Sequence, residues 1–577
     1  MLQGLHKIPF ILELFFNGSF ILLFSGKSMG KIPAAWNKEF ITTLINAGGM
    51  IVPLVLLLSV IVNYVNAKSM DEFFRKHIFS IVVFIPLLIT WGDVEFSFWL
   101  GSAHLLSSVL SLYDDGGKPK TEKGTWLSQS EVFKGLKLGS AQLVLLSFSG
   151  VILIGTFLLM LPVSTNPGKV MNFIDALFMA TSATCVTGLS TMSLENDFSL
   201  FGQIVILILI QVGGLSIMTL YASMALLMGN AMGMKERMNM QEILEVASLE
   251  ELFSMIVSIM KYTFFIELWG AIVLTIGFTF EGYEFGSAIY YGFFHSISAF
   301  CNAGFALFDT SLESYSTKPL IHGTIMVLIT MGGLGFIVIK ELKEVVVGGK
   351  SIVRLGLHSK VVIVTSFILT IAGALFIFFG EFLHALDSYT VWEKVQISLF
   401  QSITLRTAGF SSIPLTNLNT YTLYAMTLFM FIGGSPGSTA GGIKTTTLAI
   451  LYQSIKATLK GEKSVGIIDR KIPGPLVVRA TAITFISIIV TSIFILVLMR
   501  LESDQGFLAI FFEVISASGT VGLSLGITPV LSVMGKIAIA ALMLIGRIGP
   551  LTLLLAIAQR ERSTGKFDYP DGRIMIG

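Results

Sequence analysis

Charged residues are scarce in this chain of 577 amino acids: Lys, Arg, Asp and Glu together make up only 13% of it. Soluble globular domains carry about 25%. Since 54% of the residues are hydrophobic, the composition excludes an ordinary soluble protein and predicts a chain that crosses a membrane several times. The formal net charge is only +2. No basic block interleaved with aromatic residues occurs, so nucleic acid is not expected as a partner.

Cysteine is almost absent. The two residues, Cys185 and Cys301, are too few for a disulfide framework. The seven histidines show no metal-ligand spacing, and no nucleophile–base arrangement suggests catalysis. We therefore expect neither an enzyme nor a cofactor bound to this chain.

Long apolar runs are what the sequence has in abundance. A bilayer-spanning helix needs about 20 apolar residues, and such runs lie near residues 141–162, 200–228, 258–279, 321–340, 361–380, 421–434, 477–499 and 533–558. Shorter apolar stretches lie between successive pairs, near 173–185, 288–301, 392–406 and 507–518. The chain therefore repeats one unit four times: a span, a half-helix, a glycine-centred loop and a second span.

The glycine-centred loops form the most regular pattern in the sequence. Their glycines are Gly188, Gly304, Gly409 and Gly522, at intervals of 116, 105 and 113 residues. A second glycine follows each of them in the second span, 25, 28, 24 and 24 residues later, at Gly213, Gly332, Gly433 and Gly546. Two motifs that keep the same register indicate an internal repeat. The two cysteines fit this register, since each lies three residues before a loop glycine.

The distribution of charge predicts how the repeats are oriented. The segments between repeats are basic, for example Lys340, Lys343 and Arg354, whereas the segments within repeats are acidic or neutral, for example Glu195 and Asp309. Basic segments face the cytoplasm. We therefore expect a multi-pass protein of the cytoplasmic membrane whose glycine loops lie toward the outside.

The expected organisation has five parts. Residues 1–130 form an N-terminal extension with three or four hydrophobic helices, from apolar runs near 8–25, 41–65, 78–91 and 96–113. The repeats follow at 131–235, 236–350, 351–465 and 466–577, the last with a cytoplasmic tail. An even number of N-terminal helices would place Lys27, Lys31 and Lys38 outside, against the charge rule, so their number and the side that the N-terminus faces stay open.

Four irregular loops at membrane depth indicate a pore. Such a loop survives only when it is buried in protein or lines a water-filled path, and backbone carbonyls can replace the hydration shell of a cation. No loop residue is acidic, which favours a monovalent cation held by carbonyl dipoles. The candidate ligands of this cation are the carbonyls of Val186, Thr187, Gly188, Asn302, Ala303, Gly304, Thr407, Ala408, Gly409, Thr520, Val521 and Gly522. The alternative is that the glycines only allow close helix packing. The regular recurrence of four glycine-centred loops disfavours this alternative.

These residues resemble the filter segments of the Trk/Ktr/HKT potassium transporter superfamily. The resemblance rests on Thr-Gly-Leu, Asn-Ala-Gly-Phe, Arg-Thr-Ala-Gly-Phe and Thr-Val-Gly-Leu-Ser in the four repeats and covers roughly residues 130–577. Cys-Val-Thr-Gly at 185–188 and the tail at 569–577 look most like the Ktr membrane subunit. The resemblance implies a pseudo-fourfold all-α polytopic membrane fold around one pore. In the family, serine in place of the first filter glycine goes with sodium permeation, so glycine at all four positions implies potassium selectivity.

The segment 433–444 interrupts the second span of the third repeat. It contains Gly433, Gly434, Ser435, Pro436, Gly437, Ser438, Thr439, Ala440, Gly441, Gly442 and Lys444. Glycine and proline make a continuous helix costly there, and the resemblance implies an intramembrane loop that gates conduction. The alternatives are a cytoplasmic turn or a static kink. A phosphate-binding loop is disfavoured, because no strand–loop–helix context surrounds the segment. Only the third repeat shows such an interruption, so we expect the second spans to be unequal.

Charged residues inside the spans are candidates for function. Arg547, in the last span, would form an electrostatic barrier below a cation filter; its alternative is a structural role, paired with a carboxylate or with loop carbonyls. Arg406 is expected to support the third loop from behind with Glu513 as its partner, and Glu267 to be another internal brace.

The predicted function is potassium uptake by the ion-translocating subunit of a Ktr/Trk-like system. The resemblance implies a homodimer on a cytosolic ring of nucleotide-binding RCK-type subunits, with sodium as a stimulating or coupled ion. Whether transport is channel-like or coupled to Na⁺ or H⁺, and which nucleotide regulates it, stay open. The alternative is a secondary transporter for another small cation or solute, for which inverted repeats are typical; the parallel repeats disfavour it. A membrane-embedded enzyme would need clustered catalytic side chains, which the spans lack.

Overall fold

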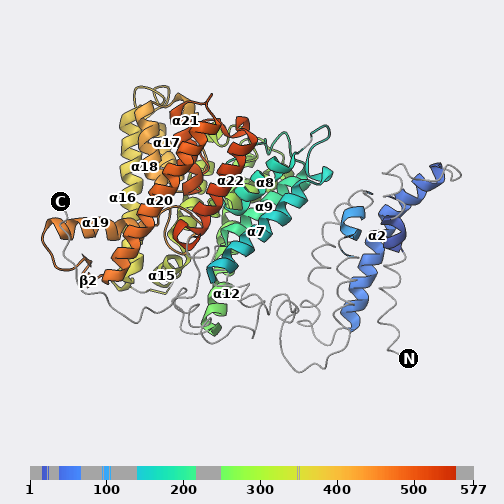
Figure 1. Ribbon diagram of the computed structural model, residues 1–577, viewed down its shortest axis with the longest axis horizontal. Coiled ribbons are helices and arrows are strands. Elements are labelled where there is room, and N and C mark those ends of the chain that lie inside the picture. The colour runs from blue at the N-terminus through green and yellow to red at the C-terminus, as the bar shows by residue number, and fades with distance from the viewer. Residues whose placement is uncertain are drawn as a thin grey trace. The chain divides into compact units, whose positions relative to one another are not determined.

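The computed structural model describes residues 16–21, 24, 38–66, 94, 97–102, 104, 140–169, 171–215, 249–346, 348–349 and 351–553. The chain divides into two compact units, Met1–Gln129 and Ser130–Gly577. Figure 1 shows that the described part of the second unit is a bundle of helices.

The first unit contains helix α2 (Lys38–Asn66), which matches the predicted run at 41–65. Residues 16–21 and 97–102 are also helical, and both pack on α2. A Cβ at Gly48 would lie 2.3 Å from the ring of Phe20, and the Ser97 hydroxyl donates to the Gly49 carbonyl oxygen at 3.0 Å. The predicted run at 78–91 lies outside the described residues.

The second unit follows the predicted order of long and short helices. The first repeat has α7 (Ser140–Leu159), α8 (Phe173–Thr184) and α9 (Leu200–Gly214), and the second has α12 (Leu249–Phe280), α13 (Phe285–Phe300), α14 (Pro319–Leu334) and α15 (Phe336–Val346). The third has α16 (Leu357–Glu381), α17 (Val391–Thr404), α18 (Thr420–Phe431) and α19 (Thr445–Leu459), and the fourth has α20 (Gly474–Leu501), α21 (Phe507–Gly519) and α22 (Val533–Ile548).

Small elements complete this unit. The 3₁₀ turns among its described residues are η2 (Pro162–Ser164), η4 (Glu313–Tyr315), η5 (Ile352–Arg354), η6 (Leu415–Asn417) and η7 (Thr528–Val530). The strands β1 (Gly466–Ile467) and β2 (Arg470–Lys471) pair antiparallel as a short hairpin. In Figure 1 this hairpin, α15 and α19 lie at one end of the unit, and α17 and α21 lie near the other.

Carboxylates at the ends of the first spans hold the starts of the second spans. Glu281 follows α12 and pairs with Lys318, the N-cap of α14, at 2.7 Å. Glu381 and Glu502, at the ends of α16 and α20, accept from the backbone N–H of the N-cap residues Asn419 and Ser532, both at 3.0 Å. A carboxylate near a helix N-terminus satisfies free N–H groups and favours the helix dipole.

The second spans of repeats two and four are also interrupted, so the expectation that only the third repeat is interrupted is wrong. α14 and α15 meet at a bend of 108°, where Gly335 has φ of 92°. α22 ends before Gly549, which has φ of 90°, and helical structure resumes at residue 550. A single glycine with positive φ suffices to redirect a helix, and a lone glycine gives a weaker sequence signal than the run of glycines in the third repeat.

Each repeat contacts the next, and the fourth contacts the first. Tyr290 donates to Gln203 at 2.7 Å between repeats two and one, and the amide of Gln396 lies 3.2 Å from His322 between repeats three and two. Repeats three and four meet at the stacked rings of Tyr424 and Phe511, whose centroids lie 6.1 Å apart. Repeats four and one meet at the ion pair of Lys536 and Asp175, at 2.8 Å.

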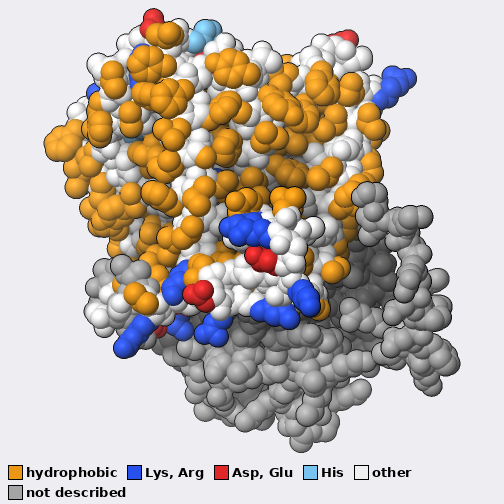
Figure 2. All heavy atoms as spheres, turned by 90° about the vertical axis from the view of Figure 1, so that its left-hand side faces the viewer, with side chains coloured by type: hydrophobic (Ala, Val, Ile, Leu, Met, Phe, Trp, Pro, Cys, Tyr) orange, Lys and Arg blue, Asp and Glu red, His pale blue; other side chains and the backbone are white. Residues whose placement is uncertain are grey.

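The outer surface of the helices is apolar, as a membrane requires. Val257–Phe280, Leu357–Glu381 and Gly474–Leu501 are long and apolar enough to cross a bilayer, and the bent pair α14–α15 would be a fourth span if counted as one, within the described residues. Figure 2 shows a broad hydrophobic band with Lys and Arg side chains gathered below it. Exposed basic residues of the segment between repeats three and four include Lys456, Lys460, Arg470 and Lys471.

Candidate functional site

The four predicted pore loops share one unusual backbone conformation. We call residues 186–188, 302–304, 407–409 and 520–522 the glycine loops. In each, the glycine and the residue two positions before it have positive φ: Val186 (56°) and Gly188 (97°), Asn302 (59°) and Gly304 (71°), Thr407 (68°) and Gly409 (78°), Thr520 (52°) and Gly522 (95°). Positive φ at a β-branched residue is rare and costs about 1–3 kcal/mol. Three of the four loops have it, at Val186, Thr407 and Thr520, which indicates a constrained site.

The glycine loops form a closed ring of contacts. A Cβ on Gly188 would lie 2.5 Å from the carbonyl oxygen of Ala303, and one on Gly304 would lie 2.9 Å from that of Ala408. A Cβ on Gly409 would lie 2.6 Å from the Val521 oxygen, and one on Gly522 would lie 2.1 Å from the Thr187 oxygen. Each glycine thus faces the carbonyl that precedes the glycine of the next repeat, and the fourth faces the first. No side chain larger than hydrogen fits at these positions without a shift of the backbone.

The short helices end at the glycine loops. α8 ends at Thr184, α13 at Phe300, α17 at Thr404 and α21 at Gly519, each three or fewer residues before the start of its loop. A helix C-terminus carries a partial negative charge of about half an elementary charge. Four such ends beside one ring of carbonyls produce an environment that favours a cation without any carboxylate.

Hydroxyl groups of the short helices hold the glycine loops, and the sequence reasoning missed them. The backbone N–H of Gly188 donates to the Ser182 hydroxyl at 3.1 Å, and that of Gly522 donates to the Ser516 hydroxyl at 3.0 Å. Ser298 and Thr404 instead donate to the carbonyls of Phe305 and Phe410, both at 2.7 Å. The signal was available, because serine occurs six residues before the glycine in three of the four repeats.

The second glycine motif packs directly behind the short helices. A Cβ on Gly213 would lie 2.0 Å from the Thr184 carbonyl oxygen, one on Gly332 1.9 Å from that of Phe300, and one on Gly546 2.2 Å from that of Ser518. In these three repeats the glycine thus lets the second span touch the last turn of the short helix. In the third repeat a Cβ on Gly433 would instead meet the carbonyl oxygen of Gly441 at 1.9 Å.

The 433–444 segment, between α18 and α19, is non-helical. Its backbone forms hydrogen bonds with the residues at the break between α14 and α15. The N–H of Ser435 donates to the Gly333 carbonyl at 3.0 Å, and the N–H of Phe336 donates to the Gly437 carbonyl at 3.1 Å. Lys444 turns its Nζ back to the Ala440 carbonyl at 2.6 Å. These bonds satisfy backbone groups that the two interrupted helices leave free.

The same segment touches the glycine loops. The Thr439 hydroxyl donates to the carbonyl of Phe300, at the end of α13, at 3.2 Å. A Cβ on Gly441 would lie 2.1 Å from the Thr520 hydroxyl oxygen. Thus the 433–444 segment contacts the glycine loop of the fourth repeat and the short-helix end of the second.

Arg547 joins this segment to the first repeat. Its side chain is 5% exposed, and its two terminal nitrogens donate to the carbonyls of Thr439 and Gly213. Of the roles weighed for Arg547, the structure contains the contact with loop carbonyls. Its planar group with several donors suits two carbonyls at once.

The predicted pairing of Arg406 with Glu513 is wrong. Both side chains are buried, but the carboxylate of Glu513 accepts from the hydroxyls of Ser524 at 2.7 Å and Thr528 at 2.5 Å. Two hydroxyls of the loop after the fourth glycine therefore occupy the acceptor that the arginine was expected to use. Hydroxyl partners leave no charge pattern in a sequence, so spacing alone did not point to them.

Glu267 lies between three elements near the first and second glycine loops. Its carboxyl oxygens face the Gln211 amide nitrogen at 3.3 Å and the Cys301 sulfur at 3.8 Å. Its backbone carbonyl accepts from Ser296 at 2.6 Å. The prediction of an internal brace agrees with these contacts. Cys185 and Cys301 are free and buried.

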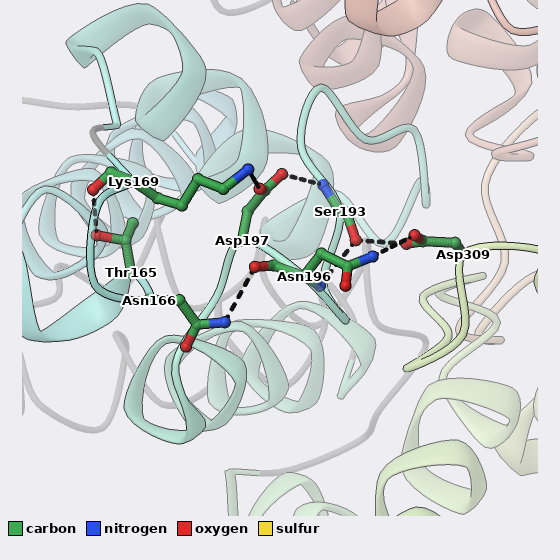
Figure 3. A network of polar contacts seen from close by, with 7 residues as sticks. All are labelled: Thr165, Asn166, Lys169, Ser193, Asn196, Asp197 and Asp309. Atoms are coloured by element: carbon green, nitrogen blue, oxygen red, sulfur yellow. Dashed lines mark hydrogen bonds and ion pairs between the residues drawn. The ribbon is translucent and has the colours of Figure 1, made fainter.

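A polar network joins loop segments of the first two repeats (Figure 3). Lys169 pairs with Asp197 at 2.7 Å, and Asp197 accepts from the Ser193 N–H at 2.9 Å. Asp309 of the second repeat accepts from the Ser193 hydroxyl and from the Asn196 amide. Partial burial opposes ionisation of Asp197, but Lys169 and the Ser193 N–H outweigh it, so the pKa of this carboxyl lies below its ordinary value.

The oxygens that lie against the glycines of the neighbouring loops are backbone carbonyls. No group of three or more His, Cys, Asp and Glu side chains that could hold a metal ion occurs in the part of the chain that the structure describes. The four predicted filter segments lie together in the ring, and all the predicted gate residues adjoin one another in the 433–444 segment or, for Arg547, bind it. The arrangement suits a weakly hydrated cation stripped of its water.

Residues 138–566 match the TrkH family model, described as a cation transport protein. The chain is 37% identical to the Ktr system potassium uptake protein B of Bacillus subtilis, over 78% of this chain and 100% of that protein. It is 35% identical to the potassium/sodium uptake protein NtpJ of Enterococcus hirae, over 76% of this chain and 98% of that protein. The crystal structure of the potassium transporter TrkH from Vibrio parahaemolyticus has a similar fold, with a TM-score of 0.57, 17% identity, and coverage of 89% of this chain and 98% of that one.

Proposed function

Because the chain belongs to the TrkH family of cation transport proteins, we propose that it takes up potassium as the ion-translocating subunit of a Ktr/Trk-like system. It is a multi-pass protein of the cytoplasmic membrane. The observation that carries the proposal is the closed ring of close approaches among Gly188, Gly304, Gly409 and Gly522. The relatives named above are potassium uptake proteins.

In this proposal the glycine loops are the selectivity filter of a pseudo-fourfold pore. Carbonyls of residues 186–188, 302–304, 407–409 and 520–522 replace the hydration shell of K⁺. The ends of the four short helices add negative potential at the same place. Potassium is favoured over sodium because a smaller, more strongly hydrated ion loses more on dehydration than these neutral dipoles return.

The 433–444 segment and Arg547 are proposed as the gate. The segment contacts Thr520 and the end of α13, and Arg547 holds it to α9. A segment with five glycines has no regular structure of its own to resist movement. Its displacement would free the space beneath the ring, and the positive charge of Arg547 would leave the path with it.

The proposed assembly is a homodimer on a ring of cytosolic nucleotide-binding subunits of the RCK type. The exposed basic residues of α19 and the hairpin after it offer a surface for such a ring. Sodium is the second candidate ion, as a stimulating, coupled or carried species, because the name of one relative includes it.

Uptake of K⁺ by a bacterium that lacks its own potassium uptake systems tests the proposal. Cells that express this chain with a Ktr-type regulatory subunit should grow on low K⁺ and accumulate it. A chain present in the membrane that supports neither growth nor accumulation, with the regulatory subunit present, contradicts the proposal. The variant Gly150→Ala serves as a positive control, since no atom lies within 4 Å of a Cβ at this helical glycine.

A further inference from the structure

Two buried serines bind the glycine loops in a way that the other two repeats do not. The hydroxyls of Ser182 and Ser516 accept hydrogen bonds from the backbone N–H of Gly188 and Gly522, at 3.1 and 3.0 Å. Both side chains have no solvent exposure. They lie six residues before their glycines, in the last turns of α8 and α21.

The other two repeats use the hydroxyl differently. Ser298 and Thr404 donate to the carbonyl of the residue that follows the glycine, and in the described residues no hydroxyl binds the N–H of Gly304 or Gly409. Gly188 and Gly522 are neighbours in the ring, as are Gly304 and Gly409. The ring therefore has two halves. In the loops of Gly188 and Gly522 the hydroxyl binds the glycine N–H, and in the loops of Gly304 and Gly409 it binds the carbonyl of the residue after the glycine.

A hydroxyl that accepts a hydrogen bond from a glycine N–H also fixes the orientation of the carbonyl of the preceding residue. The N–H of Gly188 and the C=O of Thr187 belong to one planar peptide group, so a hydrogen bond that fixes the first fixes the second. The same holds for Gly522 and Val521. The two oriented carbonyls face the ring, because the Thr187 oxygen lies against Gly522 and the Val521 oxygen lies against Gly409.

We propose that Ser182 and Ser516 are positioning residues that orient the Thr187 and Val521 carbonyls and thereby set the discrimination between K⁺ and Na⁺. The inference rests on the proposed function, since it assigns these carbonyls to a filter. In this proposal selectivity comes from the size of the carbonyl cage: carbonyls that rotate freely can close around Na⁺, whereas carbonyls held in place cannot.

The hydroxyls are not needed to attach the loops to the helices. The backbone carbonyl of Ser182 accepts from the Thr187 N–H, and that of Ser516 accepts from the Val521 N–H, both at 2.8 Å. These bonds persist when serine becomes alanine. The loss of the hydroxyl therefore frees the peptide group before each glycine and leaves the loop attached.

The test compares fluxes of K⁺ and Na⁺ for Ser182→Ala, Ser516→Ala and the double variant in the full chain with its regulatory subunit. Each single change should lower the ratio of K⁺ to Na⁺ flux about two- to tenfold, the range that loss of one neutral hydrogen bond allows. Ser182→Thr keeps the acceptor and should keep the ratio. Thr181→Val is the matched control, because the buried hydroxyl of Thr181 bonds only within its own helix, to the Leu177 carbonyl at 2.7 Å.

An unchanged ratio in both alanine variants, or an equal drop in Thr181→Val, overturns the inference. If Ser182→Ala does not reach the membrane, Ser182→Cys, a weaker acceptor of similar size, is measured instead, and an unchanged ratio there overturns it equally. Failure of the unmodified protein to move K⁺ would instead refute the proposed function. Normal K⁺ uptake with insensitive variants refutes only the role of the serines.

Discussion

Lys536 of α22 forms an ion pair with Asp175 of α8 at 2.8 Å, although 361 residues separate them in the chain. The pair joins the fourth repeat to the first. Both side chains are largely buried, at 14% and 17% exposure. Asp175 lies in the first turn of α8, where a negative charge favours the helix dipole. The pair therefore couples the closure of the ring to the stability of the first short helix.

Removal of one partner of this pair should destabilise the protein more than removal of both. Asp175→Asn leaves the Lys536 ammonium buried beside a neutral amide, which should cost about 2–4 kcal/mol of unfolding free energy, somewhat below the range for fully buried pairs. Asp175→Asn with Lys536→Met should recover part of that loss. Thermal unfolding in detergent measures both, and strictly additive losses would argue against the coupling.

Substitution of a glycine in the glycine loops should change ion selectivity. These glycines lie outside the helices, so the substitution does not act through helix stability. Gly188 has φ of 97°, and its Cβ would lie 2.5 Å from the Ala303 carbonyl. Gly188→Ala should therefore displace that carbonyl and reduce K⁺ flux, and Gly188→Ser should admit more Na⁺. Gly150→Ala is the control, since its Cβ has free space and alanine stabilises a helix by about 1 kcal/mol relative to glycine. Unchanged selectivity in both Gly188 variants would contradict the filter assignment.

Loss of the Arg547 contacts should increase conduction. Arg547→Ala removes the donors to Thr439 and Gly213, so the 433–444 segment is held less firmly and the barrier charge is gone. Flux should rise about tenfold or more, the factor equivalent to about 1.4 kcal/mol, at the low end for a hydrogen bond to a charged group. Deletion of residues 435–441 should also increase the flux. Variants that fold but conduct no faster would show that this segment is a static support.

Sequence reasoning recovered the helices and the register of the site but not its internal contacts. The half-helix predicted at 173–185 is α8 at Phe173–Thr184, because apolar length and a following glycine mark such an element well. The helical membrane fold and family membership are confirmed. The break at Gly335 was missed because a lone glycine is a weak signal, and the hydrogen bond beside it, from the Phe336 N–H to the Gly437 carbonyl, joins residues that are distant in the chain. The partners of Glu513 were missed for a similar reason, since hydroxyls that complete a buried site are chosen by the fold and carry no periodicity.

Glu267 should tolerate glutamine but not alanine. The side chain is 8% exposed, and its neighbours Gln211 and Cys301 are weakly placed donors. In the described part of the chain no Lys, Arg or His forms an ion pair with it. A full charge there would cost several kcal/mol, so Glu267→Gln should keep K⁺ uptake, whereas Glu267→Ala should lose about 1–3 kcal/mol through the unpaired polar groups. Equal losses in the two variants would mean that the charge itself is required.

The polar network around Asp197 should weaken in acid. The pKa of Asp197 is lowered in the folded protein, so ionised Asp197 contributes stability that is present above its ordinary pKa of about 3.9 and is lost as the pH falls through the lower folded value. Because the Lys169 side chain is 53% exposed, salt should screen the pair. Asp197→Asn should lower the unfolding temperature at neutral pH and have a smaller effect below about pH 4. Asn166→Ala, which removes only the bond to the Asn196 carbonyl, should show no such dependence on pH; if it does, the titrating group is not Asp197.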